Sequence, residues 1–414
     1  MSAPVVTVVA GPTRAAAPAP AAPLASLSVL PPGRDAWRTH VRTFARTHVA
    51  PRSAAMDAQA RIDPDLLPEL VRAGLLAVEV PRVYGGHGGD LLDVVVAIEE
   101  ISRVDPAVGV FVDVQNALVA AALLRHGTGD QRRRYLPRLA TGTVGAYALS
   151  EPGSGSDAFA LTTVAVPDGD GYRLTGRKAW TTSAREAGVL VVFAAVLDGP
   201  DAADGGGARR TTAFLVDRDR PGVSVQPPVR TLGIRASSTC DVVLDDVRVG
   251  REQVLGGVGD GEHVTVETLN IGKLGIAAQL LGLAEGALAA AVAYAQERRQ
   301  FGVPVGTFQG VQFPLAQLAA EVRAVRLLVH DGVALMEHPD PAERMAAAAT
   351  AKLLASQVAE RAASQAVETL GGAGFTDAHP VERLYRDAKV GTIYEGTTNM
   401  QLRTLASVLL GGAR

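Results

Sequence analysis

The segment from Tyr385 to Asn399, near the C-terminus, has the residue pattern best suited to proton transfer. Its core reads Tyr394-Glu395-Gly396-Thr397-Thr398-Asn399, which places a carboxylate between an aromatic ring and a glycine. The glycine lets a ligand approach the backbone closely. The Thr-Thr-Asn run can cap a new helix whose free N–H groups point at an anion. This pattern suits a general base beside a bound cofactor, but taken alone it favours a helix–turn–helix junction with an exposed glutamate.

A loop rich in glycine and serine lies in the first half of the chain and reads Tyr147-Ala148-Leu149-Ser150-Glu151-Pro152-Gly153-Ser154-Gly155-Ser156-Asp157. Its unshielded amides and hydroxyls can hydrogen-bond a polar ring or a pyrophosphate, although a tight turn has the same composition. Downstream, Lys178-Ala179-Trp180-Thr181-Thr182-Ser183 places one of the two tryptophans beside hydroxyls. That combination suits packing on a flat heterocycle, and a core tryptophan in a sheet is the alternative.

Paired arginines end a long apolar stretch in Glu297-Arg298-Arg299-Gln300-Phe301-Gly302, and Phe308-Gln309 follows. Arginine is favoured at a helix C-terminus by the helix dipole. It can also pair with a pyrophosphate through two parallel hydrogen bonds. A second glycine-rich segment, Glu368-Thr369-Leu370-Gly371-Gly372-Ala373-Gly374-Phe375, ends another predicted helix.

Taken together and in this order, these segments resemble the acyl-CoA dehydrogenases. The loop at Ser150–Asp157 is similar to the flavin loop of that family, Ala/Thr-Glu-Pro-Gly-x-Gly-Ser-Asp, and the segment around Glu395 to its catalytic-glutamate region. The resemblance runs from about Ala36 to Leu410 and is closest to the short-chain and short/branched-chain members at Thr231–Thr239 and Leu269–Ala277. It implies a mainly α fold: an N-terminal helical domain, a middle β-barrel-like domain and a C-terminal four-helix bundle, assembled as a homotetramer.

The resemblance also implies the roles of individual residues. Glu395 is the implied base, which removes the α-proton of an acyl thioester while flavin N5 takes a hydride from the β-carbon. FAD is the implied cofactor, and the bundle residues reach the FAD of a neighbouring subunit. The implied FAD contacts are Tyr147, Leu149, Ser150, Gly155, Ser156, Trp180, Thr182, Arg298, Phe301, Phe308, Gln309, Glu368, Gly371, Gly372, Thr397 and Asn399. The implied substrate contacts are Ser156, Asn270, Lys273, Tyr394 and Gly396, and no metal is implied.

The base occurs at two positions in this family, the Tyr-Glu-Gly site and a residue on the first bundle helix. The second position is Gly272 here, which cannot accept a proton. Glu395 is therefore the candidate base, and isovaleryl-type chemistry from the helix position is disfavoured. Lys273 stands where the family usually has arginine, and lysine keeps the charge but loses the planar fork.

The composition excludes several other classes of protein. A chain of 414 residues is long enough for two or three domains. A formal net charge of −3 gives no sign of a nucleic-acid or anionic-membrane surface. The single cysteine, Cys240, rules out an intramolecular disulfide and fits a reducing compartment; we expect it to pack in a strand. We also expect no membrane span and a cytoplasmic location.

Hydrophobic periodicity divides the chain into four parts. We expect a disordered Ala/Pro-rich tail (1–33), a helical domain (34–143), a β domain (144–260) and a four-helix bundle (261–414). The bundle helices are predicted at Leu269–Arg299, Val311–Met336, Pro341–Gly371 and Pro380–Leu410, and two earlier helices at Asp90–Arg103 and Val108–Arg125. Asp198–Arg210 reads as a surface insertion.

Several functions remain open at this point. The leading hypothesis is FAD-dependent conversion of a short or short-branched acyl-CoA to the trans-2-enoyl-CoA, with electron-transferring flavoprotein as the electron acceptor. The same chemistry on an acyl group tethered to a carrier protein and an acyl-CoA oxidase are alternatives of the same class. A flavin-free scaffold that kept the fold is an alternative of another class.

Overall fold

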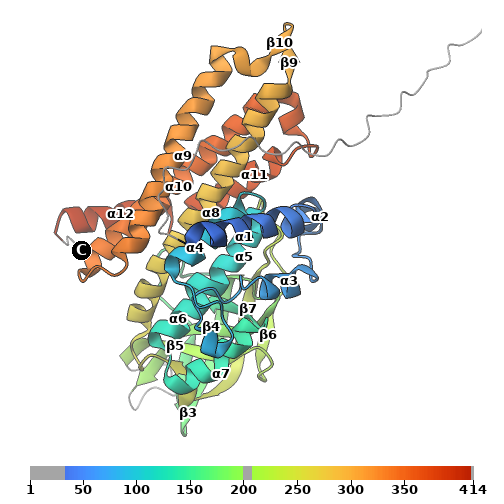
Figure 1. Cartoon of the computed structure of the whole chain (residues 1–414). Coiled ribbons are helices and arrows are strands. Elements are labelled where there is room, and N and C mark those ends of the chain that lie inside the picture. The colour runs from blue at the N-terminus through green and yellow to red at the C-terminus, as the bar shows by residue number, and fades with distance from the viewer. Residues whose placement is uncertain (1–32, 199–207, 412–414) are drawn as a thin grey trace, which may run out of the picture.

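The computed structural model describes residues 33–198 and 208–411. The predicted tail, apart from residue 33, and most of the predicted surface insertion lie outside the described residues. The described chain forms N-terminal helices, a β-sheet and a long C-terminal bundle, and the N-terminal helices lie against both the sheet and the bundle (Figure 1). The helical, β, helical order predicted from periodicity is therefore confirmed.

The N-terminal helices begin where polar residues can cap them. Asp90 accepts hydrogen bonds from two backbone amides at the start of α4, and Asp105 does the same for α5, whose first residue is Pro106. The elements are α1 (Arg34–Phe44), η1 (Ala45–Val49), α2 (Ser53–Gln59), α3 (Leu66–Arg72), η2 (Arg82–Tyr84), α4 (Leu91–Ser102), α5 (Pro106–Asp113), η3 (Val114–Ala120), α6 (Ala121–His126) and α7 (Gly129–Ala140).

The predicted helix Val108–Arg125 is present but contains a π-helical stretch, η3, between α5 and α6. Within it, the buried Asn116 side chain donates hydrogen bonds to the carbonyls of Leu75 (2.9 Å) and Val112 (2.8 Å). It also accepts one from the amide of Val78 at 2.8 Å. These bonds tie the helix to a preceding loop, and such local widening is common near functional sites. Periodicity alone does not reveal it.

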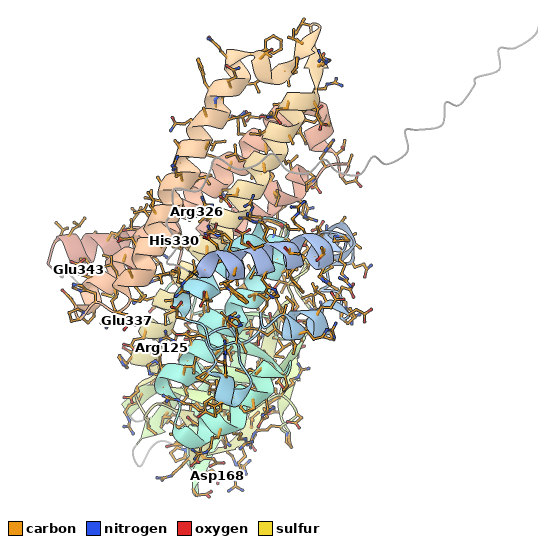
Figure 2. All side chains as sticks on the ribbon, in the orientation of Figure 1. Arg125, Asp168, Arg326, His330, Glu337 and Glu343 are labelled. Carbon is orange, nitrogen blue, oxygen red and sulfur yellow. The ribbon has the colours of Figure 1, made fainter. Side chains whose placement is uncertain are left out.

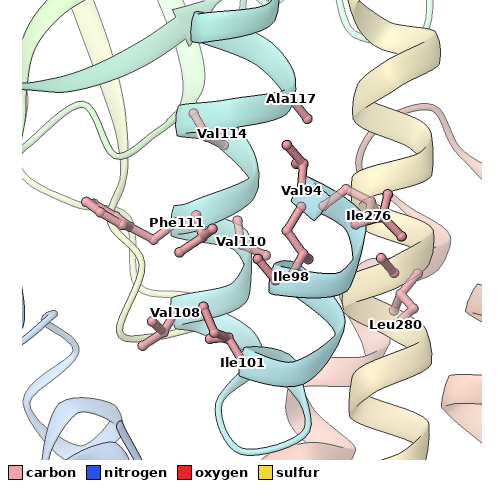
Figure 3. Close-up of a cluster of buried hydrophobic side chains, with 14 of the residues drawn as sticks. Val94, Ile98, Ile101, Val108, Val110, Phe111, Val114, Ala117, Ile276 and Leu280 are labelled. Carbon is pink, nitrogen blue, oxygen red and sulfur yellow. The ribbon is translucent and has the colours of Figure 1, made fainter. Parts of the chain in front are cut away.

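A continuous hydrophobic core joins the N-terminal helices to the first bundle helix, α8. Figure 3 shows Val94 and Ile98 of α4 facing Ile276 and Leu280 of α8. The helices pack closely because α8 carries glycine at the contact. A Cβ at Gly282 would lie 2.2 Å from a backbone carbonyl oxygen of α4, closer than such atoms can approach. This close packing holds α8 in place beside the N-terminal domain.

The middle of the chain forms an eight-stranded sheet with the order β6-β7-β3-β2-β4-β5-β8, and β1 pairs in parallel with β4. Gly169 and Asp170, residue types typical of a hairpin turn, join β2 to β3, and Gly169 has a φ of +61°. Asp168 marks the tip of this hairpin in Figure 2. Cys240 is buried in β7, as predicted. The elements are β1 (Val144–Ala148), β2 (Val164–Asp168), β3 (Gly171–Thr182), β4 (Ala187–Asp198), β5 (Ala208–Asp217), β6 (Val223–Val225), β7 (Thr239–Gly250), η5 (Arg251–Gln253) and β8 (Val254–Leu255).

The C-terminal part is a helical bundle whose last predicted helix is divided. The prediction of one helix over Pro380–Leu410 is wrong, because α11 ends at Ala388 and α12 begins at Thr398. The junction contains Glu395 with a φ of +51° and Gly396 with a φ of +87°, which a helix does not allow. The elements are α8 (Gly261–Glu297), β9 (Arg299–Gln300), β10 (Val303–Pro304), η6 (Val305–Thr307), α9 (Gln309–Leu335), α10 (Pro341–Leu370), η7 (Gly371–Phe375), α11 (Val381–Ala388), η8 (Lys389–Thr392) and α12 (Thr398–Leu409).

Helix α8 also begins earlier than its predicted start at Leu269. Its first turns carry Glu262, His263 and Glu267, whose polar side chains interrupt the apolar period used for the prediction. Two helical stretches, Pro106–His126 and α8, are apolar and long enough to cross a bilayer. Their most apolar windows are 94% and 67% buried inside the protein, so we interpret both as core helices.

Candidate active site

Glu395 lies in a turn that is fixed from both sides. Its left-handed backbone is uncommon for a residue other than glycine and marks local strain. After the turn, the hydroxyl of Thr397 accepts a hydrogen bond from the amide of Met400 (3.3 Å) and caps α12. From the same helix, the side-chain amide of Gln401 donates to the carbonyls of Glu395 (3.0 Å) and Gly396 (2.9 Å). The turn is therefore held in one conformation before any ligand binds.

Two lysines approach the turn from other helices. Lys352 of α10 is fully buried, and its Nζ donates a hydrogen bond to the carbonyl of Gly396 at 2.6 Å. Lys273 of α8 donates to the side chain of Asn270 at 3.0 Å. Burial raises the pKa of Glu395 to about 7, while the charges of Lys273 and Lys352 act in the opposite direction. A carboxylate with a pKa near the working pH is well suited to act as a general base.

One face of α8 carries glycine where the turn approaches it. A Cβ at Gly272 would lie 3.0 Å from Oε2 of Glu395 and 2.7 Å from the side chain of Leu118. The Oε2 atom itself is buried and has no hydrogen-bond partner among the described residues. Further along the same helix, Gln279 accepts a hydrogen bond from the hydroxyl of Tyr394 at 2.9 Å. Gly272 thus leaves room for the carboxylate of Glu395.

A second carboxyl group lies close to Glu395. Asp113, the last residue of α5, is fully buried, and neither of its carboxyl oxygens has a hydrogen-bond partner among the residues described. It packs against Gly275, one helical turn beyond Gly272. Burial, together with the charge of Glu395, raises the pKa of Asp113 well above its ordinary value. Both effects favour the neutral, protonated form of Asp113.

The glycine- and serine-rich loop is anchored by a buried ion pair. Glu151 accepts a hydrogen bond from Nζ of Lys178 at 2.7 Å, and both side chains are buried. Glu151 also accepts from the amides of Thr162 (2.6 Å) and Thr163 (3.0 Å). Burial alone would raise the pKa of Glu151, but these donors hold it at about 2. The carboxylate therefore stays charged and fixes the shape of the loop.

The anchored loop and Trp180 leave a surface that fits a flat, polar cofactor. The pairing of β3 with β7 is irregular between Lys178 and Thr181, and Trp180 has a φ of +58°. This bulge turns the tryptophan outward, so that 61% of it is exposed. A Cβ at Gly155 would meet nothing within 4 Å, so the backbone of the loop is open to a ligand. An exposed indole beside accessible amides matches the requirements of a flavin ring and its phosphates.

The remaining predicted residues of the β domain lie around this surface. Tyr147 of β1 and Leu149 are buried, and the charge of Glu395 contributes to raising the pKa of Tyr147, although burial is the main cause. The carbonyl of Ser150 accepts a hydrogen bond from Ala179 (2.8 Å), which links the loop to the strand of Trp180. Ser156 is exposed on the loop, and Thr182 ends β3.

A second group of predicted FAD contacts is not brought to this surface within one chain. It comprises Arg298, Phe301, Phe308, Gln309, Glu368, Gly371 and Gly372. These residues lie at the ends of α8 and α10 and around the β9–β10 hairpin, at the opposite end of the molecule from the sheet (Figure 1). The rings of Phe301 and Phe308 pack edge to face, with their centroids 6.1 Å apart. The side chain of Phe301 is 94% exposed. Thr397 uses its hydroxyl to cap α12, where Asn399 is exposed in the first turn.

Three residues around Glu395 were not predicted from the sequence: Lys352, Asp113 and Gln401. The signal for Lys352 was present: it is a single cation among small apolar residues in Ala349-Thr350-Ala351-Lys352-Leu353-Leu354-Ala355. A lysine on the apolar face of a helix implies a buried partner. Asp113 gave a similar signal within the apolar run Val110-Phe111-Val112-Asp113-Val114. Gln401 gave none, because its role depends on a turn that local sequence does not specify.

Almost the whole chain matches one family of known proteins. Family models of the acyl-CoA dehydrogenase N-terminal, middle and C-terminal domains match residues 32–143, 146–247 and 259–410. A probable short/branched chain specific acyl-CoA dehydrogenase of Dictyostelium discoideum is 45% identical over 371 residues, which cover 89% of this chain and 88% of that protein.

Solved structures show the same fold. Butyryl-CoA dehydrogenase from Megasphaera elsdenii superposes with a TM-score of 0.87 at 34% identity, over 92% of this chain and 99% of that one. Acyl-CoA dehydrogenase complexed with FAD from Bacillus anthracis gives 0.84 at 30% identity, over 93% of this chain and 68% of that one. The chain therefore belongs to the acyl-CoA dehydrogenase family, FAD-dependent oxidoreductases that act on the CH–CH group of an acyl-CoA.

Proposed function

We propose that this enzyme converts a short or short-branched acyl-CoA to the trans-2-enoyl-CoA, with Glu395 as the base. The observation that carries the assignment of the base is the buried Oε2 of Glu395, which faces Gly272 and has no hydrogen-bond partner among the described residues. Its lone pairs are free to accept the α-proton. FAD supplies the hydride acceptor when it is bound.

The residues around Glu395 support this role. The side-chain amide of Gln401 and the ammonium of Lys352 hold the backbone of the turn, so the carboxylate needs little reorganisation before it reacts. Burial raises the pKa of Glu395 to about 7, which makes the carboxylate a stronger base than one in solution. The choice of a short or short-branched acyl group is supported by the name of the Dictyostelium relative.

We infer that the FAD site is completed by a second copy of the chain. The anchored loop with Trp180 would hold the flavin, and the exposed group around Arg298 and Phe301 would reach the FAD of a neighbouring subunit. The exposed aromatic side chains at that end, Phe301 (94%) and Phe375 (86%), favour such an association. We also propose that the chain assembles as a homotetramer, passes its electrons to electron-transferring flavoprotein and is located in the cytoplasm. The proposed domains begin at residues 34, 144 and 261.

An anaerobic titration tests the proposed reaction. The purified yellow protein is mixed with butyryl-, isobutyryl-, 2-methylbutyryl- and octanoyl-CoA while the visible flavin band is followed. We expect rapid bleaching by one of the short esters and no bleaching in Glu395→Gln, which keeps the size of the side chain but cannot accept the proton. A variant that still bleaches would refute Glu395 as the base.

The alternatives give different outcomes in the same titration. Bleaching by octanoyl-CoA alone would refute the choice of a short acyl group. A yellow protein bleached only by acyl groups on a carrier protein would establish the carrier-tethered reaction. Fast reoxidation by air after bleaching would indicate an oxidase, and a purified protein without flavin would favour a scaffold.

A further inference from the structure

Three potential metal ligands converge at the junction between α6 and α8. His126 is the last residue of α6, and His263 and Glu267 lie on the first turns of α8. The spacing of four residues places His263 and Glu267 on the same face of the helix. Glu267 precedes Gly272 by five residues, a rotation of roughly 140° about the helix axis, so the two face different sides of α8.

The distances among these ligands suit a small cation. Oε2 of Glu267 lies 3.5 Å from Nε2 of His126 and 3.6 Å from Nε2 of His263. The ligand atoms of all three residues lie within 4.8 Å of one another. A tetrahedral zinc ion with bonds of about 2.0–2.2 Å holds its ligand atoms roughly 3.3–3.6 Å apart. A small rotation of the exposed His263 side chain would bring all three ligand atoms to these separations.

His126 provides an independent sign of a missing partner. Its side chain is only 10% exposed, and its Nε2 is buried without a hydrogen-bond partner among the described residues. Buried ring nitrogens are normally satisfied, so an unpaired one that points at two further ligands needs a physical explanation.

The surroundings leave the proposed ligand atoms available. Arg344 approaches the other carboxylate oxygen of Glu267, with its Nη2 3.8 Å from Oε1, so Oε2 is left to the histidines. Arg125, the residue before His126, lies at the end of α6 on the left side of the molecule in Figure 2. The backbone carbonyl of His126 accepts a hydrogen bond from Gly256 at 3.2 Å, which brings the segment after β8 to the same place.

We propose that His126, His263 and Glu267 bind one divalent transition metal ion of the zinc class, with water completing the coordination. Two imidazoles and one carboxylate are a ligand set typical of zinc. The ion would join the C-terminal end of α6 to the start of α8, next to the segment that leaves the sheet. Because the ligands face a different side of α8 from Gly272, the ion would stabilise the junction of the domains.

The test uses the full-length, FAD-loaded protein without a histidine tag, treated with a chelator and then dialysed. Zinc binding is measured by equilibrium dialysis with metal analysis, and the thermal unfolding midpoint is followed with and without zinc. Cobalt serves as a spectroscopic probe, since its visible bands report the number and type of ligands. His263→Ala and Glu267→Gln remove one ligand each at positions that are not fully buried, and His379→Ala removes a histidine elsewhere as a matched control.

We expect one zinc ion per chain and a rise in the unfolding midpoint with zinc in the wild type and in His379→Ala. Affinity should fall at least tenfold in His263→Ala and Glu267→Gln, and the rise in the midpoint should disappear. Wild-type protein that binds no zinc would overturn the proposal. Binding that is equally strong in both ligand variants, or equally weakened in His379→Ala, would overturn it as well.

Discussion

Oε2 of Glu395 faces Gly272, and a Cβ added at Gly272 would lie 3.0 Å from that oxygen. This relationship joins the C-terminal turn to the first bundle helix across more than one hundred residues of sequence. The contact explains why α8 has glycine at position 272: the carboxylate of Glu395 occupies the space that a side chain would fill.

Gly272→Ala should displace the carboxylate while leaving the flavin in place. The new methyl group would meet both Oε2 and, at 2.7 Å, the side chain of Leu118. Because a displacement of about 1 Å at a reacting group can cost about 100-fold in rate, we expect kcat to fall about 10- to 100-fold. Stopped-flow reduction of the flavin measures the effect. Gly310→Ala on α9 is the control, since its Cβ would meet nothing within 4 Å; equal rates in the two variants would contradict the contact.

Loss of the Lys352 charge should move the pH profile of the reaction. Burial raises the pKa of Glu395 to about 7, and the charges of Lys273 and Lys352 lower it. The base must be ionised, so kcat/KM should rise with pH through about 7 in the wild type. In Lys352→Met the pKa of Glu395 should be higher, and the rise should move to higher pH.

The control for this prediction is Lys389→Met, because Lys389 is exposed and pairs with Glu360 at 2.8 Å. Its profile should match the wild type. A Lys352→Met enzyme that is slower at every pH, with an unshifted profile, would show that Lys352 supports the fold and not the pKa of the base.

Asp387 should make the folded protein less stable as the pH rises. Burial raises the pKa of Asp387 to about 7 in the folded state, above its value in the unfolded chain. The folded state then binds more protons, so this residue lowers the free energy of unfolding as the pH increases from about 4 to 7. Each pKa unit corresponds to about 1.4 kcal/mol.

Asp387→Asn removes this titration and can still accept the hydrogen bond from the amide of Ile234. We expect the variant to be more stable than the wild type at pH 8 and to lose the advantage near pH 4. Chemical denaturation across this pH range measures both free energies. If the free energies of unfolding of the two proteins differed by the same amount at every pH, Asp387 would not have a raised pKa in the folded state.

The Glu151–Lys178 ion pair should control both stability and flavin retention. In Glu151→Gln the ammonium of Lys178 stays buried without its carboxylate, a change that typically costs about 3–5 kcal/mol. The loop should lose its fixed shape, and the purified variant should contain less FAD. The unfolding midpoint and the ratio of flavin to protein absorbance measure the two effects.

The double variant Glu151→Gln/Lys178→Met tests the cause. Because it removes the unpaired charge, it should recover part of the stability while flavin content stays low. A double variant that is less stable than Glu151→Gln alone would show that Lys178 stabilises the protein by some other contact.

Local features were predictable because nearby residues determine them. Thr397 caps α12 as its position before a helical run predicts, and the Gly169-Asp170 hairpin joins β2 to β3 as its sequence indicates. The predicted helix over Pro380–Leu410 was wrong for the opposite reason. Its apolar period continues on both sides of the Glu395 turn, and only packing against α8 and α10 decides that the helix is interrupted there.

Residue types and their spacing along the chain were enough to predict the order of the regions, the family and the candidate base. Which groups surround that base depends on how the helices pack. Lys352, Asp113 and Gly272 come from three separate helices and meet Glu395 only after those helices pack. Packing also placed Arg298 and Phe301 at the far end of the bundle from Trp180 (Figure 1). These groups could not be predicted from the sequence because burial and charge act through space, whereas caps and turns depend on residues that are close along the chain.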